Sequence, residues 1–228
     1  MGNVRGVFVQ ANGDVLVADY GADRVLRIPG GTGSAINVGS GWNSPTDVFA
    51  TSNGDVWVSD NRNDQIKVVR GGAGTPEVFA PTFSFNRPWG VFVAASGSVY
   101  VTDSGSGGRV LMFAYGDGAV APTSLCPGYF RGLFVTPQNA TYVADSANGA
   151  VKMCSNGTAT TVATGFASPY DVSVTAAGDV YVLQATATPS VIKLPGGNGS
   201  AAEGVAGTSN IGGYPRSFYI DGTVYSGA

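Results

Sequence analysis

Short runs of apolar residues alternate with polar turns along the whole chain, and one four-residue pattern returns about every forty residues. The pattern is a large apolar or aromatic residue, a Val, a further residue and an acid, as in Tyr100-Val101-Thr102-Asp103. It stands at 16–19, 57–60, 100–103, 142–145 and 181–184, where the last copy ends on Gln184 instead of an acid. A repeat of this length carried by strand-like segments predicts repeated four-stranded units.

The second repeat shows how the strands are arranged. Residues 46–50 are expected to form a strand, 52–55 a hairpin turn and 56–59 the strand that returns antiparallel. A third strand is expected at 65–69 and a fourth around 77–79. No segment has a sustained helical period of apolar residues. Four short antiparallel strands in each repeat predict an all-β fold, a β-propeller.

The repeats also share a wider order of residues. The third contains Pro88-Trp89-Gly90-Val91-Phe92-Val93, then Gly97-Ser98-Val99-Tyr100-Val101-Thr102-Asp103-Ser104, then Arg109-Val110, and the first has the same order at 5–9, 13–19 and 23–25. This order resembles that of the NHL-repeat family over nearly the whole chain. The resemblance implies a six-bladed β-propeller. WD repeats are similar in length, but this chain lacks their Gly-His and Trp-Asp signatures and contains no His.

The chain is expected to be one NHL-type domain over 1–228, with an incomplete sixth blade. The blades are expected at about 4–44, 45–87, 88–129, 130–168 and 169–214, with a partial blade at 215–228. That last segment has residues for two inner strands only, so the sixth blade should have an uncovered edge that can pair with another chain. Either the chain is cut short of its native end, or the edge serves self-association.

Composition narrows the range of partners. The 43% hydrophobic content is ample for a core, while only 12% of the residues are charged. The 12 Lys and Arg are spread over the repeats, which argues against nucleic acid, because phosphate binding needs clustered cations. No apolar run approaches the roughly 18 residues of a membrane span, so this segment is not expected to insert into a membrane. A surface that is polar mainly through uncharged residues suits an extracellular or cell-surface ectodomain.

A ring of six side chains is expected at one face. The connections between blades open near the central channel, so the residues that begin the inner strands should surround its mouth. The repeat places there Arg5, Thr46, Trp89, Arg131, Tyr170 and Arg216. Guanidinium groups beside large aromatics can bind a carboxylate, a phosphate, a peptide or a sugar. The alternative is structural, with Arg stems covering the blade junctions and their heads in water.

One residue further along the inner strands, two acids are expected to line the channel. Three of the six repeats have Gly there, which suits a place where strands crowd the axis, but two have Asp47 and Asp171. These carboxylates can hold a cation such as Ca²⁺ together with backbone carbonyls, or pair with the nearby arginines. Two carboxylates do not require a metal, so we favour ion pairing and expect no cofactor and no metal site.

Catalysis has few candidate residues. The chain contains no His, which removes Ser-His-Asp chemistry and most zinc sites. The acids that close the repeated pattern lie in different blades, so they are expected to bind the backbone of the following turn instead of forming one site. An acid-based reaction at Asp47 or Asp171 is the remaining enzymatic alternative.

The two cysteines are expected to be free thiols. Cys126 should follow a fourth strand near the ring face, and Cys154 should end a third strand near the opposite face. At about 3.3 Å per residue along a strand, that separation exceeds the roughly 7 Å limit between the Cα atoms of a disulfide.

These observations predict a non-enzymatic binding or sensing domain, part of a larger extracellular protein. It is expected to bind a protein, a peptide or a small anionic or sugar ligand at the channel face. The two alternatives are a His-free propeller lyase or hydrolase, and a structural propeller that assembles through the edge of its sixth blade.

Overall fold

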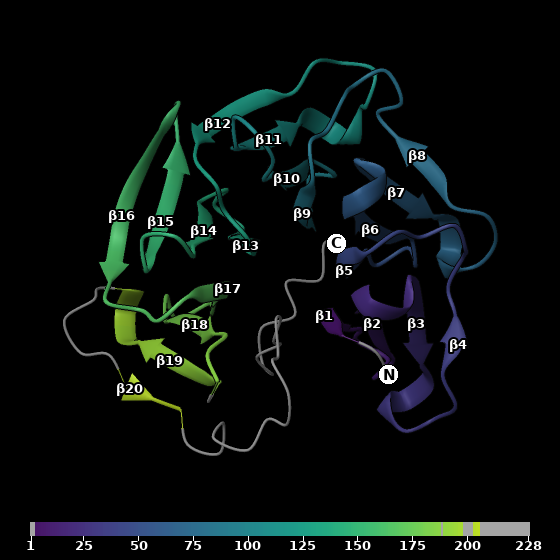
Figure 1. The fold of residues 1–228 in the computed structure, drawn as a ribbon, viewed down its shortest axis with the longest axis horizontal. Coiled ribbons are helices and arrows are strands. Elements are labelled where there is room, and N and C mark those ends of the chain that lie inside the picture. Colours follow the sequence, from purple (N-terminus) through teal and green to yellow (C-terminus); the bar gives the residue numbers. More distant parts are fainter. Residues whose placement is uncertain (1–2, 188, 198–202, 206–228) are drawn as a thin grey trace.

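The chain folds into four-stranded antiparallel sheets arranged as blades around a common centre (Figure 1). The structure is a computed structural model that describes residues 3–187, 189–197 and 203–205. Blade 1 contains β1 (Val4–Val9), β2 (Val15–Asp19), β3 (Arg24–Ile28) and β4 (Ile36–Asn37). Blade 2 contains β5 (Pro45–Ala50), β6 (Val56–Asp60), β7 (Gln65–Val69) and β8 (Glu77–Phe79).

The described residues form three further blades. Blade 3 contains β9 (Pro88–Val93), β10 (Val99–Asp103), β11 (Arg109–Phe113) and β12 (Thr123–Pro127). Blade 4 contains β13 (Leu133–Val135), β14 (Thr141–Asp145), β15 (Ala150–Ser155) and β16 (Thr158–Thr164). Blade 5 contains β17 (Pro169–Val174), β18 (Val180–Gln184), β19 (Ser190–Leu194) and β20 (Glu203–Gly204).

Single turns of 3₁₀ helix join many of these strands. They are η1 (Tyr20–Ala22), η2 (Pro29–Gly31), η3 (Asn61–Asn63), η4 (Arg70–Gly72), η5 (Ala114–Gly116) and η6 (Pro195–Gly197). Within the described ranges, no helix is long and apolar enough to cross a membrane.

The prediction of an all-β propeller with four-stranded antiparallel blades is confirmed. Each inner strand contacts the next one in the order β1, β5, β9, β13 and β17, so the five blades stand side by side around the centre in Figure 1. The predicted partial sixth blade at 215–228, with its open edge, lies outside the described residues. Five blades are therefore established, and the count of six stays a prediction.

Local signals explain why the strands form where they do. In blade 2 the predicted hairpin is confirmed, since Thr51 N–H donates to the Asp55 carbonyl at 3.0 Å and Gly54 N–H to the Thr51 carbonyl at 2.9 Å. Gly54 has a φ of +88° in this turn, a conformation that glycine adopts without strain. The two strands then pair in register, with Val48 opposite Val58.

The core contains residues of inner, middle and outer strands, and a row of aromatic rings on the inner strands connects the blades. Phe8, Phe49, Phe92 and Phe134 occupy the same place in β1, β5, β9 and β13, and each ring packs on the next with centroids 4.8–5.5 Å apart. Such tilted and edge-to-face pairs contribute beyond the burial of the rings themselves. In blade 5 the corresponding residue is Ser173, so the series of rings stops there. This packing fixes how each inner strand is placed against its neighbour.

The prediction of two free thiols is wrong, because Cys126 and Cys154 form a disulfide with their Cα atoms 5.3 Å apart. It joins β12, the outer strand of blade 3, to β15 of blade 4. Adjacent strands of a sheet rotate by roughly 20–25°, so an outer strand no longer runs parallel to its inner strand. Position along β12 therefore does not measure height above the blade. β12 contacts β15 and β16 of blade 4, and Gly157 N–H of that blade donates to the Leu125 carbonyl at 2.8 Å.

Candidate functional site

Hydrogen bonds between blades fix the backbone of Trp89 and Arg131 at the channel face. The Thr46 hydroxyl donates to the Trp89 carbonyl at 2.8 Å, which ties blade 2 to blade 3. The Thr102 hydroxyl donates to the Arg131 carbonyl at 2.6 Å and accepts the Gly90 N–H at 2.7 Å, which ties blade 3 to blade 4. Both large side chains are therefore placed by short side chains of the preceding blade.

Arginines and aromatic rings alternate across this face. The Arg131 guanidinium carbon lies 4.2 Å from the ring centre of Tyr170 and 4.9 Å from that of Trp89. The Arg5 guanidinium lies 4.9 Å from Trp89 and 3.4 Å from Tyr20, and Arg62 lies 5.8 Å from Tyr20. We call this set the cation–aromatic ladder; in spatial order it consists of Arg62, Tyr20, Arg5, Trp89, Arg131 and Tyr170.

Two guanidinium groups of the ladder lack an anionic partner within the part of the chain that the structure describes. Arg131 and Arg62 form no ion pair and no side-chain hydrogen bond with a described residue. Cation–π contact stabilises such a group by about 0.5–2 kcal/mol, but it does not use the N–H edge. That edge is available to a carboxylate or another anion.

The predicted ring is brought together in part. Arg5, Trp89, Arg131 and Tyr170 lie close together, and the Trp89 and Tyr170 rings pack edge to face at 5.6 Å. Thr46 is 2% exposed and its hydroxyl is used by the neighbouring blade, so it supports the site without facing it. Tyr170 is also buried, at 1% exposed, and acts as a wall behind Arg131. Arg216 lies outside the described residues.

Asp47 and Asp171 pack against the glycines of the preceding blades. A Cβ on Gly6 would lie 2.7 Å from Asp47 Cα, and one on Gly132 would collide with the Asp171 carboxylate. This close approach confirms why Gly is needed at these positions. Asp171 accepts the N–H of Val172 at 2.9 Å.

Asp47 joins blades 2 and 3 through its carboxylate. It accepts the N–H groups of Val48 and Val91, both at 2.9 Å, and no Lys or Arg of the described ranges lies within ion-pair distance of it. Removal from water raises the pKa of Asp47 to about 7, although these two hydrogen bonds act in the opposite direction. The expected ion pair with an arginine is therefore absent for Asp47 among the described residues.

The prediction that the repeating acids bind the backbone of the following turn is confirmed for Asp145, which accepts the Asn148 N–H at 3.1 Å. It is wrong for Asp60 and Asp103, whose backbone partners lie before the first strand of the blade. Asp60 and Asp103 accept the N–H groups of Asn43 and Asn86 at 2.7 and 2.6 Å. Each of the four acids also pairs with a cation of the third strand, which the sequence did not indicate: Asp19 with Arg24, Asp60 with Lys67, Asp103 with Arg109 and Asp145 with Lys152. In blade 5 Gln184 stands in place of the acid and Ser190 begins the third strand. The Gln184 amide donates a hydrogen bond to the Ser190 hydroxyl where other blades have an ion pair. These acids form no common site, and the described residues contain no group of three or more potential metal-ligating side chains.

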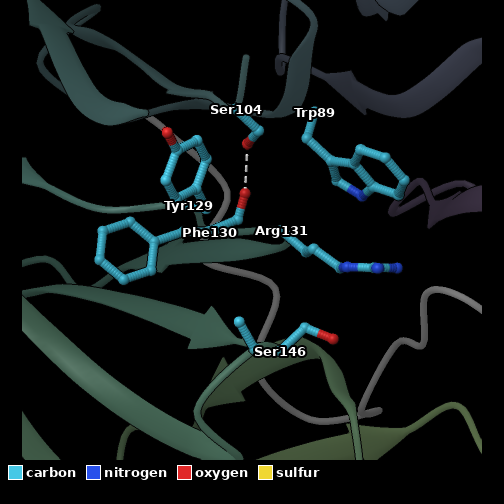
Figure 2. A pocket seen from close by; sticks show the side chains of 7 residues that line it. Trp89, Ser104, Tyr129, Phe130, Arg131 and Ser146 are labelled. Carbon is cyan, nitrogen blue, oxygen red and sulfur yellow. Dashed lines mark hydrogen bonds between the residues drawn. The ribbon is translucent and has the colours of Figure 1, made fainter. Parts of the chain in front are cut away.

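A pocket of about 260 Å³ lies beside the ladder, at the junction of blades 3 and 4. Trp89, Tyr129 and Phe130 supply aromatic walls, and the remaining lining comes from Arg131, Ser104, Ser146 and Ala147. Figure 2 shows Trp89 and the Arg131 side chain on one side of it and Tyr129 and Phe130 on the other. The pocket and the ladder share Trp89 and Arg131, so they form one candidate site.

Sequence reasoning missed several of these residues because they lie in loops. Tyr20, Ser104 and Ser146 each directly follow the repeating acid at the end of the second strand. Aligning that position across the repeats would have found them, since it opens onto the same face in every blade. Arg62 lies one residue further along in blade 2, and Tyr129 lies in the connection before blade 4, where no repeated signal marks it.

No protein-family model matches the sequence, and no curated protein matches it. Solved structures do share the fold. A chain of the nidogen/laminin complex superposes with a TM-score of 0.74 at 16% identity, over 90% of this chain and 81% of that chain. A candidate gluconolactonase gives 0.74 at 17%, over 92% and 80%. A catalytically inactive histidine-to-alanine variant of virginiamycin B lyase from Staphylococcus aureus, with quinupristin, gives 0.67 at 12%, over 89% and 69%. At these identities the likeness establishes the β-propeller fold alone.

Proposed function

We propose that this chain is an NHL-type propeller domain that binds an anionic ligand at its channel face, through the cation–aromatic ladder. The observation that carries the proposal is Arg131, which contacts two aromatic rings and has no carboxylate partner among the described residues. Its backbone is held by Thr102 and by the Ala144 carbonyl. A guanidinium that contacts two rings, and whose N–H groups bond to no described residue, is suited to bind a carboxylate or phosphate.

The disulfide supports a location outside the cell. Disulfides persist in oxidising compartments and are rare in the cytosol, and Cys126–Cys154 joins two blades of this domain. We therefore propose that the domain is extracellular or displayed at a cell surface. A chain of the nidogen/laminin complex has the same fold, so an acidic segment of another protein is a candidate ligand beside small anions.

Binding of anions by the wild-type domain tests this proposal. Saturation-transfer NMR would be recorded with inorganic phosphate, succinate, glucose 6-phosphate, an acidic tripeptide and, as the neutral member, glucose. We expect at least one anion to bind and glucose not to bind. Arg131→Gln should weaken that binding about tenfold or more, because a hydrogen bond to a charged group contributes about 1.5–3 kcal/mol.

The matched control is Arg70→Gln, which removes the same charge from a 54% exposed side chain in blade 2. Arg70 lies in η4, at the opposite end of the strands from the ladder. The control should bind like the wild type. If none of the anions binds, or if Arg70→Gln and Arg131→Gln weaken binding equally, the proposal is wrong.

Catalysis is the second candidate, and Asp47 is the observation in its favour. A carboxyl with a pKa of about 7 can exchange a proton near neutral pH, and enzymes share this fold. Two observations count against catalysis. Both oxygens of Asp47 already accept backbone N–H groups. The chain also has no His, whereas the histidine-to-alanine variant of the lyase is catalytically inactive. Hydrolysis of gluconolactone or cleavage of quinupristin by the wild type, lost in Asp47→Asn, would replace the binding proposal with this one.

A further inference from the structure

The pocket at the junction of blades 3 and 4 has the size and walls for one small ring. Its volume of about 260 Å³ is below the roughly 300–1,000 Å³ of pockets that hold drug-sized ligands. It is nevertheless several times the roughly 30 Å³ that a single water occupies in the liquid. The pocket therefore suits a molecule or a side chain with a single ring.

The walls favour an apolar ring over a sugar. Trp89 and Tyr129 are both partly exposed, so a flat group can lie against them. The three hydroxyls of the lining are already engaged. Ser104 donates to the Phe130 carbonyl, Ser146 shares a hydrogen bond of 3.1 Å with Ser168, and the Tyr129 hydroxyl accepts the Gly107 N–H at 3.4 Å. A sugar needs several hydrogen-bond partners when it leaves water, and those engaged groups supply few.

The charge at the pocket favours a carboxylate. Arg131 lines the pocket, its guanidinium extends beneath Trp89 in Figure 2, and it has no ion-pair partner among the described residues. The described residues that line the pocket include no Asp or Glu. One guanidinium matches the two oxygens of one carboxylate. A single ligand with its carboxylate at Arg131 and its ring between Trp89 and Tyr129 would need only a short linker between the two groups.

We propose that this pocket binds the aromatic ring of a monocarboxylic acid whose carboxylate pairs with Arg131. This inference rests on the proposed function and adds the class of ligand. The same chemistry occurs in a free aryl acid and in the C-terminal aromatic residue of a peptide. Binding requires no covalent step and no metal.

The test uses 3-phenylpropionate and its neutral isostere 3-phenylpropionamide. Each is titrated into the wild-type protein, and binding is followed by calorimetry or NMR. We expect the acid to bind at least about tenfold more tightly than the amide. Arg131→Gln should reduce binding of the acid to the level of the amide. Ala147→Phe should fill the pocket and weaken the acid about tenfold or more, because Ala147 is an exposed lining residue that tolerates a larger side chain.

Ala119→Phe and Arg70→Gln are the matched controls. Ala119 is exposed in the connection before β12, away from the pocket lining, so both controls should bind the acid like the wild type. Glycyl-glycyl-phenylalanine and its C-terminal amide separate the two sources: tighter binding of the free tripeptide than of 3-phenylpropionate assigns the pocket to peptide termini, and weaker binding assigns it to small acids.

The outcomes separate this inference from the function on which it rests. If Ala147→Phe binds the acid as tightly as the wild type does, or if acid and amide bind equally, the pocket proposal is wrong. If the aryl acid fails while phosphate or succinate binds through Arg131, the pocket proposal is wrong and the ladder proposal stands. If no anion of either set binds, both are wrong.

Discussion

Two groups of basic side chains lie near the strand ends that open onto the channel face, and they differ in what faces them. In the blade bodies, the cations of the third strands pair with buried aspartates at 2.6–3.2 Å. Around the axis, Arg131 and Arg62 face aromatic rings and have no carboxylate partner within the described ranges. The first group uses its charge to hold a blade together. The second leaves its charge available at the surface.

The pKa values of the nearby carboxylates depend on burial as well as on pairing. Burial acts to raise the pKa of Asp145, but hydrogen bonds from Lys152 and Asn148 outweigh it and lower that pKa below its ordinary value. Asp47, near the axis, has only backbone N–H partners among the described residues, and burial raises its pKa. The ion pair and hydrogen bonds outweigh burial at Asp145, whereas at Asp103 burial still raises the pKa despite the pair with Arg109.

The largest expected effect is the loss of an ion pair in a blade body. Asp60 is fully buried, and its partner Lys67 is 11% exposed at the side chain. Asp60→Ala leaves that ammonium without its counterion and frees the N–H of Asn43, so we expect the free energy of unfolding to fall by about 3–5 kcal/mol. Urea denaturation measures it.

The exposed pair of Arg70 and Glu77 provides the control for that experiment. Glu77→Ala should change the free energy of unfolding by less than about 1 kcal/mol. Equal losses in the two variants would show that burial does not distinguish these ion pairs, and would contradict the first half of the comparison.

Removal of the disulfide is expected to have the next largest effect. The bond closes a loop with a sequence separation of 28 residues, and chain entropy predicts that the Cys126→Ser, Cys154→Ser double variant loses about 3–4 kcal/mol. Thermal and urea denaturation with and without reductant measure it. Reductant should destabilise the wild type and leave the double variant unchanged. An unchanged wild type would contradict the disulfide assignment.

Asp47 should make stability depend on pH in a defined direction. Its pKa is about 7 in the folded state and 3.8 in the reference state, so the folded protein retains the proton to higher pH. Ionisation then destabilises the fold, and the contribution of Asp47 falls as the pH rises from about 4 to about 7. The Asp47→Asn variant has an amide that does not ionise, so its free energy of unfolding should not fall in this way as the pH rises.

Urea denaturation of wild type and Asp47→Asn at several pH values between 4 and 8 measures the effect. We expect the difference in unfolding free energy to shift in favour of the variant by on the order of 1–3 kcal/mol. This is less than the full effect of about 1.4 kcal/mol per pKa unit, because the residue as a whole is partly exposed. Parallel pH profiles would show that Asp47 has an ordinary pKa.

The smallest expected effect on stability is that of Arg131→Gln. The variant loses two cation–π contacts and no hydrogen bond or ion pair to a described residue, so unfolding should change by about 0.5–1 kcal/mol. Denaturation midpoints measure it beside the binding assays. A loss as large as that of Asp60→Ala would mean that Arg131 serves the fold, and the two groups of cations would then not differ.

The sequence predicts the blades well because their signals are local. The repeated pattern and the hairpin residues determine which segments pair, and the strands of blade 2 form as expected at β5 to β8. The disulfide was not predictable in this way. It depends on the accumulated twist of a sheet and on how β12 leans on the next blade, neither of which is recorded in residue spacing.

The candidate site is predictable in part for a similar reason. The repeat identifies the residues that begin the inner strands, and Arg5, Trp89 and Arg131 come together. It does not show that the short side chain of Thr46 turns to the next blade, where its hydroxyl reaches the Trp89 carbonyl. The loop residue Tyr129 was also not predictable, because it lies outside the repeated positions.

The central claim is that an anion binds at the ladder, and Trp89 reports on it directly. Of the three tryptophans, Trp42 and Trp57 are each 6% exposed, while Trp89 lies against Arg131. We would follow the three indole N–H signals by NMR during titration with the tightest-binding anion. The account predicts that the Trp89 signal moves with saturation while the other two stay in place. A Trp89 signal that stays in place at saturation would contradict it.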